Sequence, residues 1–61
     1  MAKFVVTIET DNAAFEDAGR EIETARILRD IARRLDKGDD FDTRRLVFDA
    51  NGNHAGFAQF K

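Results

Sequence analysis

The chain has 61 residues, of which 36% are charged, with a formal net charge of −2, one histidine and no cysteine. This length suits a single small domain over residues 1–61, and the weak, mixed charge argues against a dominant electrostatic attraction to nucleic acid or to anionic membranes. Disulfides and thiolate metal sites are excluded because there is no cysteine.

The first predicted element is a strand from Lys3 to Thr10, because apolar and β-branched residues alternate along it. One face of this strand carries Phe4, Val6 and Ile8, and the other carries Val5, Thr7 and Glu9.

The segment after this strand leaves the start of the next helix open. Asp11 and Asn12 supply turn and capping chemistry, but Gly19 interrupts the helical pattern that follows them. Phe15 lies between these two signals, and we expect it to pack against the core, as most such residues do.

A helix is predicted from about Arg20 to Lys37, because apolar residues recur along it at helical spacing. The face expected to contact the core carries Ile27, Leu28, Ile31 and Leu35, flanked by Ala25 and Ala32. Gly38 follows directly and is expected to end the helix in the left-handed conformation. Residues 39–42 then form a short connection.

Two further strands, from about Thr43 to Asp49 and from His54 to Phe60, flank a turn that contains Asn51-Gly52, a strong hairpin signal. A two-residue loop would place Phe48 opposite Ala55 and Leu46 opposite Phe57. A three-residue loop with a bulge at Gly52 would shift the register by one residue, so that Val47 pairs with Ala55 and Arg45 lies across from Phe57. Apolar matching favours the shorter loop.

The order of elements predicts an α+β fold, a two-layer β-α-β-β domain in which one helix packs on one face of a three-stranded antiparallel sheet. We expect the first strand to pair with the last. The sheet face under the helix is expected to carry Phe4, Val6, Ile8, Leu46, Phe48 and Phe57. The opposite face is expected to be a partner or dimer surface and to carry Val5, Val47, Ala58 and Phe60.

The sequence carries no evident catalytic or metal-binding constellation, and we expect no enzyme activity, cofactor or small-molecule substrate. The chain has no Cys and no Ser, and His54 lies beside the turn and not in an evident cleft. Asp49-Ala50-Asn51-Gly52-Asn53 has some calcium-loop residues, but its glycine comes too early and Phe60 stands where the loop needs a glutamate. Turn formation accounts for this segment.

A basic ridge is predicted on the helix, opposite the apolar face, and consists of Arg26, Arg29, Arg33 and Lys37. Such a ridge could contact phosphates in a nucleic-acid groove. Glu23 and Asp30 lie beside it and can pair with Arg26, Arg33 or Arg34, so a salt-bridged solvent face is the favoured interpretation.

Two segments together resemble a group of small uncharacterised proteins of bacteriophages and prophages. These segments are Ala25-Arg26-Ile27-Leu28-Arg29 in the helix and Asp49 to Phe57, of the form Asp-x-Asn-Gly-Asn-x-x-Gly-aromatic. The resemblance covers residues 4–57 and implies a phage or mobile-element accessory protein, with no known active site to carry over. Such accessory proteins often act by occluding a surface, and inhibitors of host defence nucleases are among them.

We therefore expect a non-enzymatic binding protein. A protein partner or self-association as a homodimer is favoured over nucleic acid, and nucleic-acid binding through the basic ridge is the alternative. No apolar run approaches the length of a spanning helix, and Met1-Ala2-Lys3-Phe4 lacks the apolar region of a secretion signal. We expect a cytoplasmic location and no membrane contact.

Overall fold

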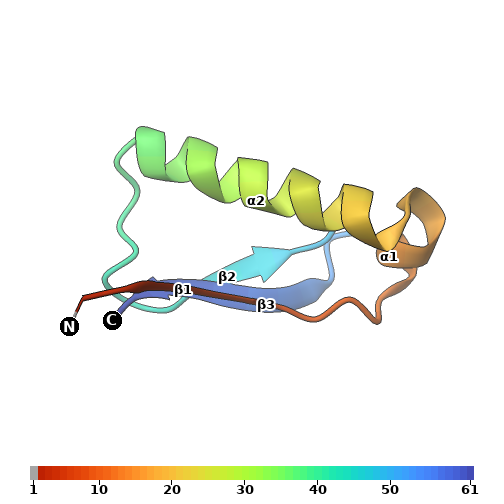
Figure 1. The fold of residues 1–61 in the computed structure, drawn as a ribbon, viewed down its shortest axis with the longest axis horizontal. Helices are drawn as coiled ribbons and strands as arrows, with labels where there is room; N and C mark the ends of the chain where they lie inside the picture. The colour runs from red at the N-terminus through yellow and green to blue at the C-terminus, as the bar shows by residue number, and fades with distance from the viewer. Residues whose placement is uncertain (1) are drawn as a thin grey trace.

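The computed structural model describes residues 2–61. Its elements follow the order β1 (Phe4–Ile8), α1 (Ala13–Ala18), α2 (Arg20–Asp36), β2 (Arg45–Phe48) and β3 (His54–Phe60). The strands form an antiparallel sheet in the order β1-β3-β2. Both helices lie on one side of this sheet, and within residues 2–61 no helix or strand covers the other side (Figure 1). The predicted α+β architecture, with the first strand paired to the last, is confirmed.

Gly19 divides the helical region into two helices. Its φ of 93° is a conformation that residues with a Cβ rarely adopt, so α1 ends there and α2 starts at Arg20. The short helix α1 places Phe15 in the core, where 2% of the surface of this residue is exposed, as the sequence predicts.

Helix α2 ends at Asp36, one residue before the predicted Lys37, and Gly38 follows with the predicted positive φ, 84°. The Gly38 N–H donates to the Leu35 carbonyl and the Asp39 N–H donates to the Arg34 carbonyl, both at 3.0 Å. This pair of bonds is a Schellman motif, which satisfies carbonyls that the helix end would otherwise leave without a donor.

The hairpin between β2 and β3 combines the two predicted registers. Beyond the turn Leu46 pairs with Phe57, as the shorter loop requires, whereas next to the turn Phe48 pairs with His54, as the longer loop requires. A β-bulge between these pairs absorbs the extra residue. Only Gly52 in the turn has a positive φ, 81°, so the two-residue turn with two positive φ values does not form. The prediction of the shorter loop is therefore wrong at the turn.

The core is built by apolar residues from every layer of the fold. Its fully buried members are Phe15, Ile27, Ile31, Phe41, Val47, Ala55 and Ala58, and Phe4, Val6, Ile8 and Leu35 pack against them. Phe41 is 1% exposed although it lies in the connection after α2, where the sequence suggests only a loop. Its ring lies 5.7 Å from the ring of Phe4, edge to face.

The two faces of the hairpin are the reverse of the prediction. Val47 and Ala58, expected on the outer side, are 3% and 0% exposed, whereas Leu46 and Phe48, expected in the core, are about half exposed. The pairing of β1 with β3 is the cause. Val6 faces the helices and lies opposite Ala58, and cross-strand partners share a face.

The small side chains of β3 leave room in the core for larger residues from outside the sheet. Ala55 and Ala58 lie under the helices, and Phe15 and Phe41 fill the space above them. Leu28 was also predicted in the core and is 46% exposed, because the buried stripe of α2 runs through Glu23, Ile27 and Ile31 at steps of four residues.

Candidate functional site

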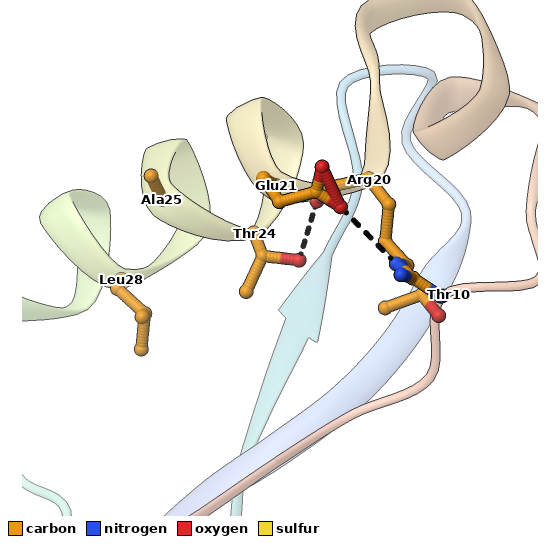
Figure 2. A pocket seen from close by; sticks show the side chains of 6 residues that line it. All are labelled: Thr10, Arg20, Glu21, Thr24, Ala25 and Leu28. Carbon is orange, nitrogen blue, oxygen red and sulfur yellow. Dashed lines mark hydrogen bonds and ion pairs between the residues drawn. The ribbon is translucent and has the colours of Figure 1, made fainter.

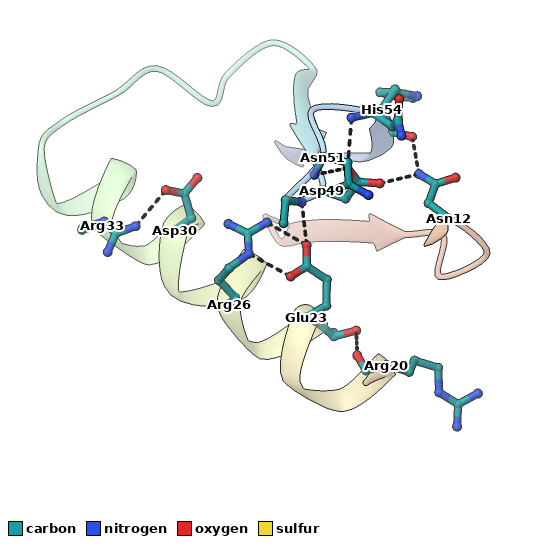
Figure 3. Close-up of polar contacts among 12 residues, drawn as sticks. Asn12, Arg20, Glu23, Arg26, Asp30, Arg33, Asp49, Asn51 and His54 are labelled. Carbon is teal, nitrogen blue, oxygen red and sulfur yellow. Dashed lines mark hydrogen bonds and ion pairs between the residues drawn. The ribbon is translucent and has the colours of Figure 1, made fainter. Parts of the chain in front are cut away.

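The most connected polar group in the structure is a cluster formed by Asn12, Glu23, Arg26 and Asp49, called here the Glu23–Asp49 cluster (Figure 3). Glu23 is 2% exposed and accepts two hydrogen bonds from the Arg26 guanidinium, at 2.9 Å from Nε and 2.8 Å from Nη2. Its Oε2 also accepts the Ala50 N–H at 2.8 Å. Helix α2 is thereby bonded to the hairpin turn.

Asp49 organises the turn itself. Its Oδ1 accepts the N–H groups of Asn51 at 2.9 Å and Asn53 at 3.0 Å. Its Oδ2 accepts the side-chain amide of Asn12 at 2.9 Å, and the same amide nitrogen lies 3.2 Å from the His54 carbonyl oxygen. Asn12 therefore ties the segment before α1 to the hairpin instead of capping α1 with its side chain.

The hydrogen bonds keep both carboxyl groups ionised. Those from Arg26 lower the pKa of Glu23 below its ordinary value and outweigh burial, which alone would raise it. Burial would likewise raise the pKa of Asp49, but hydrogen bonds from Asn53, Asn12 and Asn51 together lower it. A carboxylate held this way is a poor proton donor near neutral pH, so the cluster joins parts of the fold and offers no general acid.

Acid should therefore destabilise the protein. Because both pKa values are lower in the folded chain, the unfolded chain binds more protons once the pH falls toward their ordinary values of 4.5 and 3.8. We expect the urea midpoint to stay level from neutral pH down to about pH 5 and to fall progressively below it. The variant Glu23→Gln/Asp49→Asn should be less stable at neutral pH and lose less on acidification. A parallel acid loss in both proteins would contradict this assignment.

An open hollow of about 430 Å³ lies beside the start of α2 (Figure 2). Its lining consists of Thr10, Arg20, Glu21, Thr24, Ala25 and Leu28. The Arg20 and Glu21 side chains approach to 3.4 Å but are 72% and 84% exposed, so this ion pair is solvated. The Thr24 hydroxyl donates to the Arg20 carbonyl at 2.7 Å. Both contacts join residues of α2 to one another.

The basic ridge of α2 is partly neutralised. Arg26 is engaged by Glu23, and Arg33 pairs with Asp30 at 3.0 Å, which confirms that these acidic residues can pair with the ridge. Among residues 2–61, Arg29 and Lys37 make no ion pair within 4 Å. Two of the four predicted cations thus remain available to an anionic partner.

The uncovered side of the sheet is called here the outer sheet face, and it carries Val5, Thr7, Leu46, Phe48, His54, Phe57 and Gln59. Leu46 is 49% exposed and Phe48 is 50% exposed. The Phe48 and His54 rings meet edge to face with their centroids 6.2 Å apart. Large apolar side chains on a face with no covering layer are typical of an interaction surface.

The predicted surface residues divide between the two sides of the sheet. Val5 lies on the outer sheet face, where the alternation of β1 places it, and it is half-buried. Val47 and Ala58 belong to the core instead. Phe60 lies opposite Phe4 with the ring centroids 4.7 Å apart, so it belongs to the helix side although 46% of its surface is exposed.

Sequence reasoning missed both the burial of Glu23 and the exposed pair Leu46 and Phe48. The position of Glu23 four residues before Ile27 was the available signal for the first, because it places the carboxylate on the buried stripe of α2. Alternation alone gives no signal for the second, since it defines two faces without saying which one the helices cover.

Comparison with protein-family models, with curated proteins and with solved structures gave no match. Within residues 2–61 no helix combines the length and apolar character needed to cross a bilayer. No three or more His, Asp or Glu side chains in the described part of the chain gather where they could hold a metal ion.

Proposed function

We propose that this chain is a small non-enzymatic binding module that docks on a macromolecular partner through the outer sheet face. The observation that carries the proposal is the half exposure of Leu46 and Phe48 on a side of the sheet that neither helix covers. In so short a chain, leaving two large apolar side chains in water forgoes burial that the fold could use. A partner on this face would recover that burial.

The resemblance to phage and prophage proteins supports an accessory role in the cytoplasm of a bacterial host. Occlusion of a host surface, including inhibition of a defence nuclease, is the subordinate form of the proposal. The motif residues Asp49, Gly52 and Gly56 all have roles in the turn or in strand packing. The motif therefore supports a shared fold and names no partner.

Self-association is a second form of docking on the same surface. Two outer sheet faces in contact would bury Leu46 and Phe48 of both copies, and sedimentation at several concentrations would detect the dimer.

Nucleic-acid binding through the basic ridge is the alternative function. It is weakened because Arg26 and Arg33 are already paired, so it depends on Arg29 and Lys37.

An affinity pull-down from a bacterial lysate, with and without nuclease, tests the proposal. We expect the wild-type chain to retain a stoichiometric partner and the variant Leu46→Thr/Phe48→Thr to lose it, and a partner that survives nuclease treatment is a protein. The matched control is Ile22→Thr/Leu28→Thr, which removes apolar side chains that are 65% and 46% exposed on α2 and should retain the partner. Loss only in Arg29→Glu/Lys37→Glu would favour the basic ridge, and loss after nuclease would mean that the partner is held through nucleic acid.

A further inference from the structure

The outer sheet face has a basic rim made by Lys3, Arg44 and Lys61. Lys3 and Lys61 exchange backbone hydrogen bonds of 2.8 and 2.7 Å, which extends the pairing of β1 with β3 by one residue pair. Alternation along the strands places both side chains on the outer sheet face. Like charges directly opposite each other on a sheet destabilise it, so an anion between them would relieve the repulsion.

The third cation of the rim lies over an aromatic ring. The Arg44 guanidinium is 4.1 Å from the centre of the Phe57 ring, within the distance of a cation–π contact. Within residues 2–61 none of the three rim cations has a carboxylate partner within 4 Å, whereas each of the four ion pairs there uses an arginine of α2. A chain of net charge −2 thus leaves its unpaired rim cations on the uncovered side of the sheet.

One acidic residue lies on this face, at the end away from the basic rim. Glu9 follows β1, its N–H donates to the Ala55 carbonyl, and alternation places its side chain on the outer sheet face at the end of β1 opposite Lys3. Asp42 precedes β2, and Asp49 after β2 is buried with its oxygens occupied. No residue within the three strands is acidic. The end of the face that carries the three cations therefore complements a negatively charged partner.

The aromatic rings on this face favour a polyanion that also carries flat groups able to stack on them. Phe48 is half exposed beside His54, and Phe57 and the Arg44 plane above it form a second flat surface. Unstacked bases lie on aromatic rings and on guanidinium planes, which is how sheet surfaces hold single strands without reading their sequence. Bases inside a duplex are already stacked and cannot use these surfaces.

We infer that the outer sheet face binds single-stranded nucleic acid, with bases stacked on Phe48 and on the Arg44–Phe57 pair and phosphates held by Lys3 and Lys61. The inference rests on the proposed docking function of the same face and names its partner. A second copy of the chain fits less well, because its outer sheet face carries the same three cations and one acidic side chain, Glu9. An acidic protein surface would meet the same cations, but a single strand also presents a flat base for stacking with every nucleotide.

Fluorescence anisotropy with labelled single-stranded oligouridylate and oligothymidylate of about ten nucleotides tests the inference. We expect saturable binding at about 50 mM salt, with a duplex of the same length and a polyglutamate peptide binding much more weakly. Phe48→Ala should weaken single-strand binding about tenfold. Lys3→Gln/Lys61→Gln should weaken binding and reduce the slope of log affinity against log salt by about 1.4.

Matched controls separate this face from the rest of the surface. Ile22→Ala removes a more exposed apolar side chain, and Arg29→Gln/Lys37→Gln removes the unpaired cations of the basic ridge, so neither should change binding. Circular dichroism of each variant establishes that it is folded.

Three results would overturn the inference. These are no saturable single-strand binding, equal binding of duplex or polyglutamate, and loss of binding in the ridge variant but not in Phe48→Ala. If single strands fail to bind while a nuclease-resistant protein is captured in a manner that depends on Leu46 and Phe48, the inference fails and the proposed function stands. If both fail, the outer sheet face is not a binding surface.

Discussion

Gly56→Ala should abolish the folded state. A Cβ added at Gly56 would lie 1.8 Å from the Thr7 carbonyl oxygen and 2.8 Å from the Thr7 carbonyl carbon. Both atoms belong to the backbone of β1, so relief requires separating β1 from β3 next to the Ile8–Gly56 pair. We expect a loss of at least about 3 kcal/mol, which is comparable to the whole stability of a domain this small.

Urea unfolding followed by far-ultraviolet circular dichroism measures this effect. The matched control is Gly52→Ala, where the added Cβ meets nothing within 4 Å and the cost comes only from the φ of 81°. That variant should lose about 1 kcal/mol and remain folded. If Gly56→Ala were as stable as Gly52→Ala, the close approach of β1 to β3 at this position would be wrong.

Glu23→Gln should produce the second-largest loss, about 2 to 3 kcal/mol. The change keeps the size of the side chain but removes the charge that accepts two hydrogen bonds from Arg26 and one from the Ala50 N–H. An amide has one acceptor oxygen in place of two, so one of these donors loses its partner. Because Glu23 is 2% exposed, water cannot readily replace the lost bond.

The control for this prediction is Asp30→Asn, which removes the other carboxylate that pairs with the basic ridge at a spacing of three residues. Asp30 and Arg33 are 44% and 70% exposed, so their ion pair is solvated and its loss should cost less than about 1 kcal/mol. Chemical denaturation of both variants at neutral pH gives the comparison. Equal losses would mean that the burial of Glu23 contributes nothing.

The sequence was sufficient where one local rule decides the structure. Gly38 ends α2 because a left-handed residue completes the helix terminus, and no distant contact competes with that rule. The alternation of β1 likewise predicts which of its residues face the core, since Phe4, Val6 and Ile8 are its bulkiest residues on one side. The burial of Phe15 follows from a different general rule, that large apolar side chains in a small domain usually pack into the core.

Local sequence rules do not predict the register of the hairpin or which of its faces is buried. Each candidate loop length predicted one half of the observed register, and the bulge that joins the halves depends on contacts of β3 with both neighbouring strands. Which face of the hairpin packs against the helices depends on the volumes of the side chains that fill the core. Phe41 and Phe15 fill the space above Ala55 and Ala58, and a sequence pattern does not say that residues outside the strands will do so.

The candidate site was harder to predict because its apolar residues lie on the sheet face that does not contact the helices, and that face is known only once the core is known. Leu46 and Phe48 become surface residues only once Val47 is known to point inward, and that follows from the pairing of β1 with β3. The cations of the rim are distant in sequence, and the pairing of β1 with β3 brings Lys3 and Lys61 together.

The backbone pairing of Lys3 with Lys61 bears on how the protein should be handled. Lys3 and Lys61 lie side by side at one end of the sheet, with their side chains on the side that the helices leave uncovered. A purification tag attached next to Lys3 or Lys61, or immobilisation through such a tag, would therefore obstruct access to the outer sheet face. Since the chain has no native thiol, a single cysteine placed at the exposed Glu16 of α1 would attach the protein from the helix side instead.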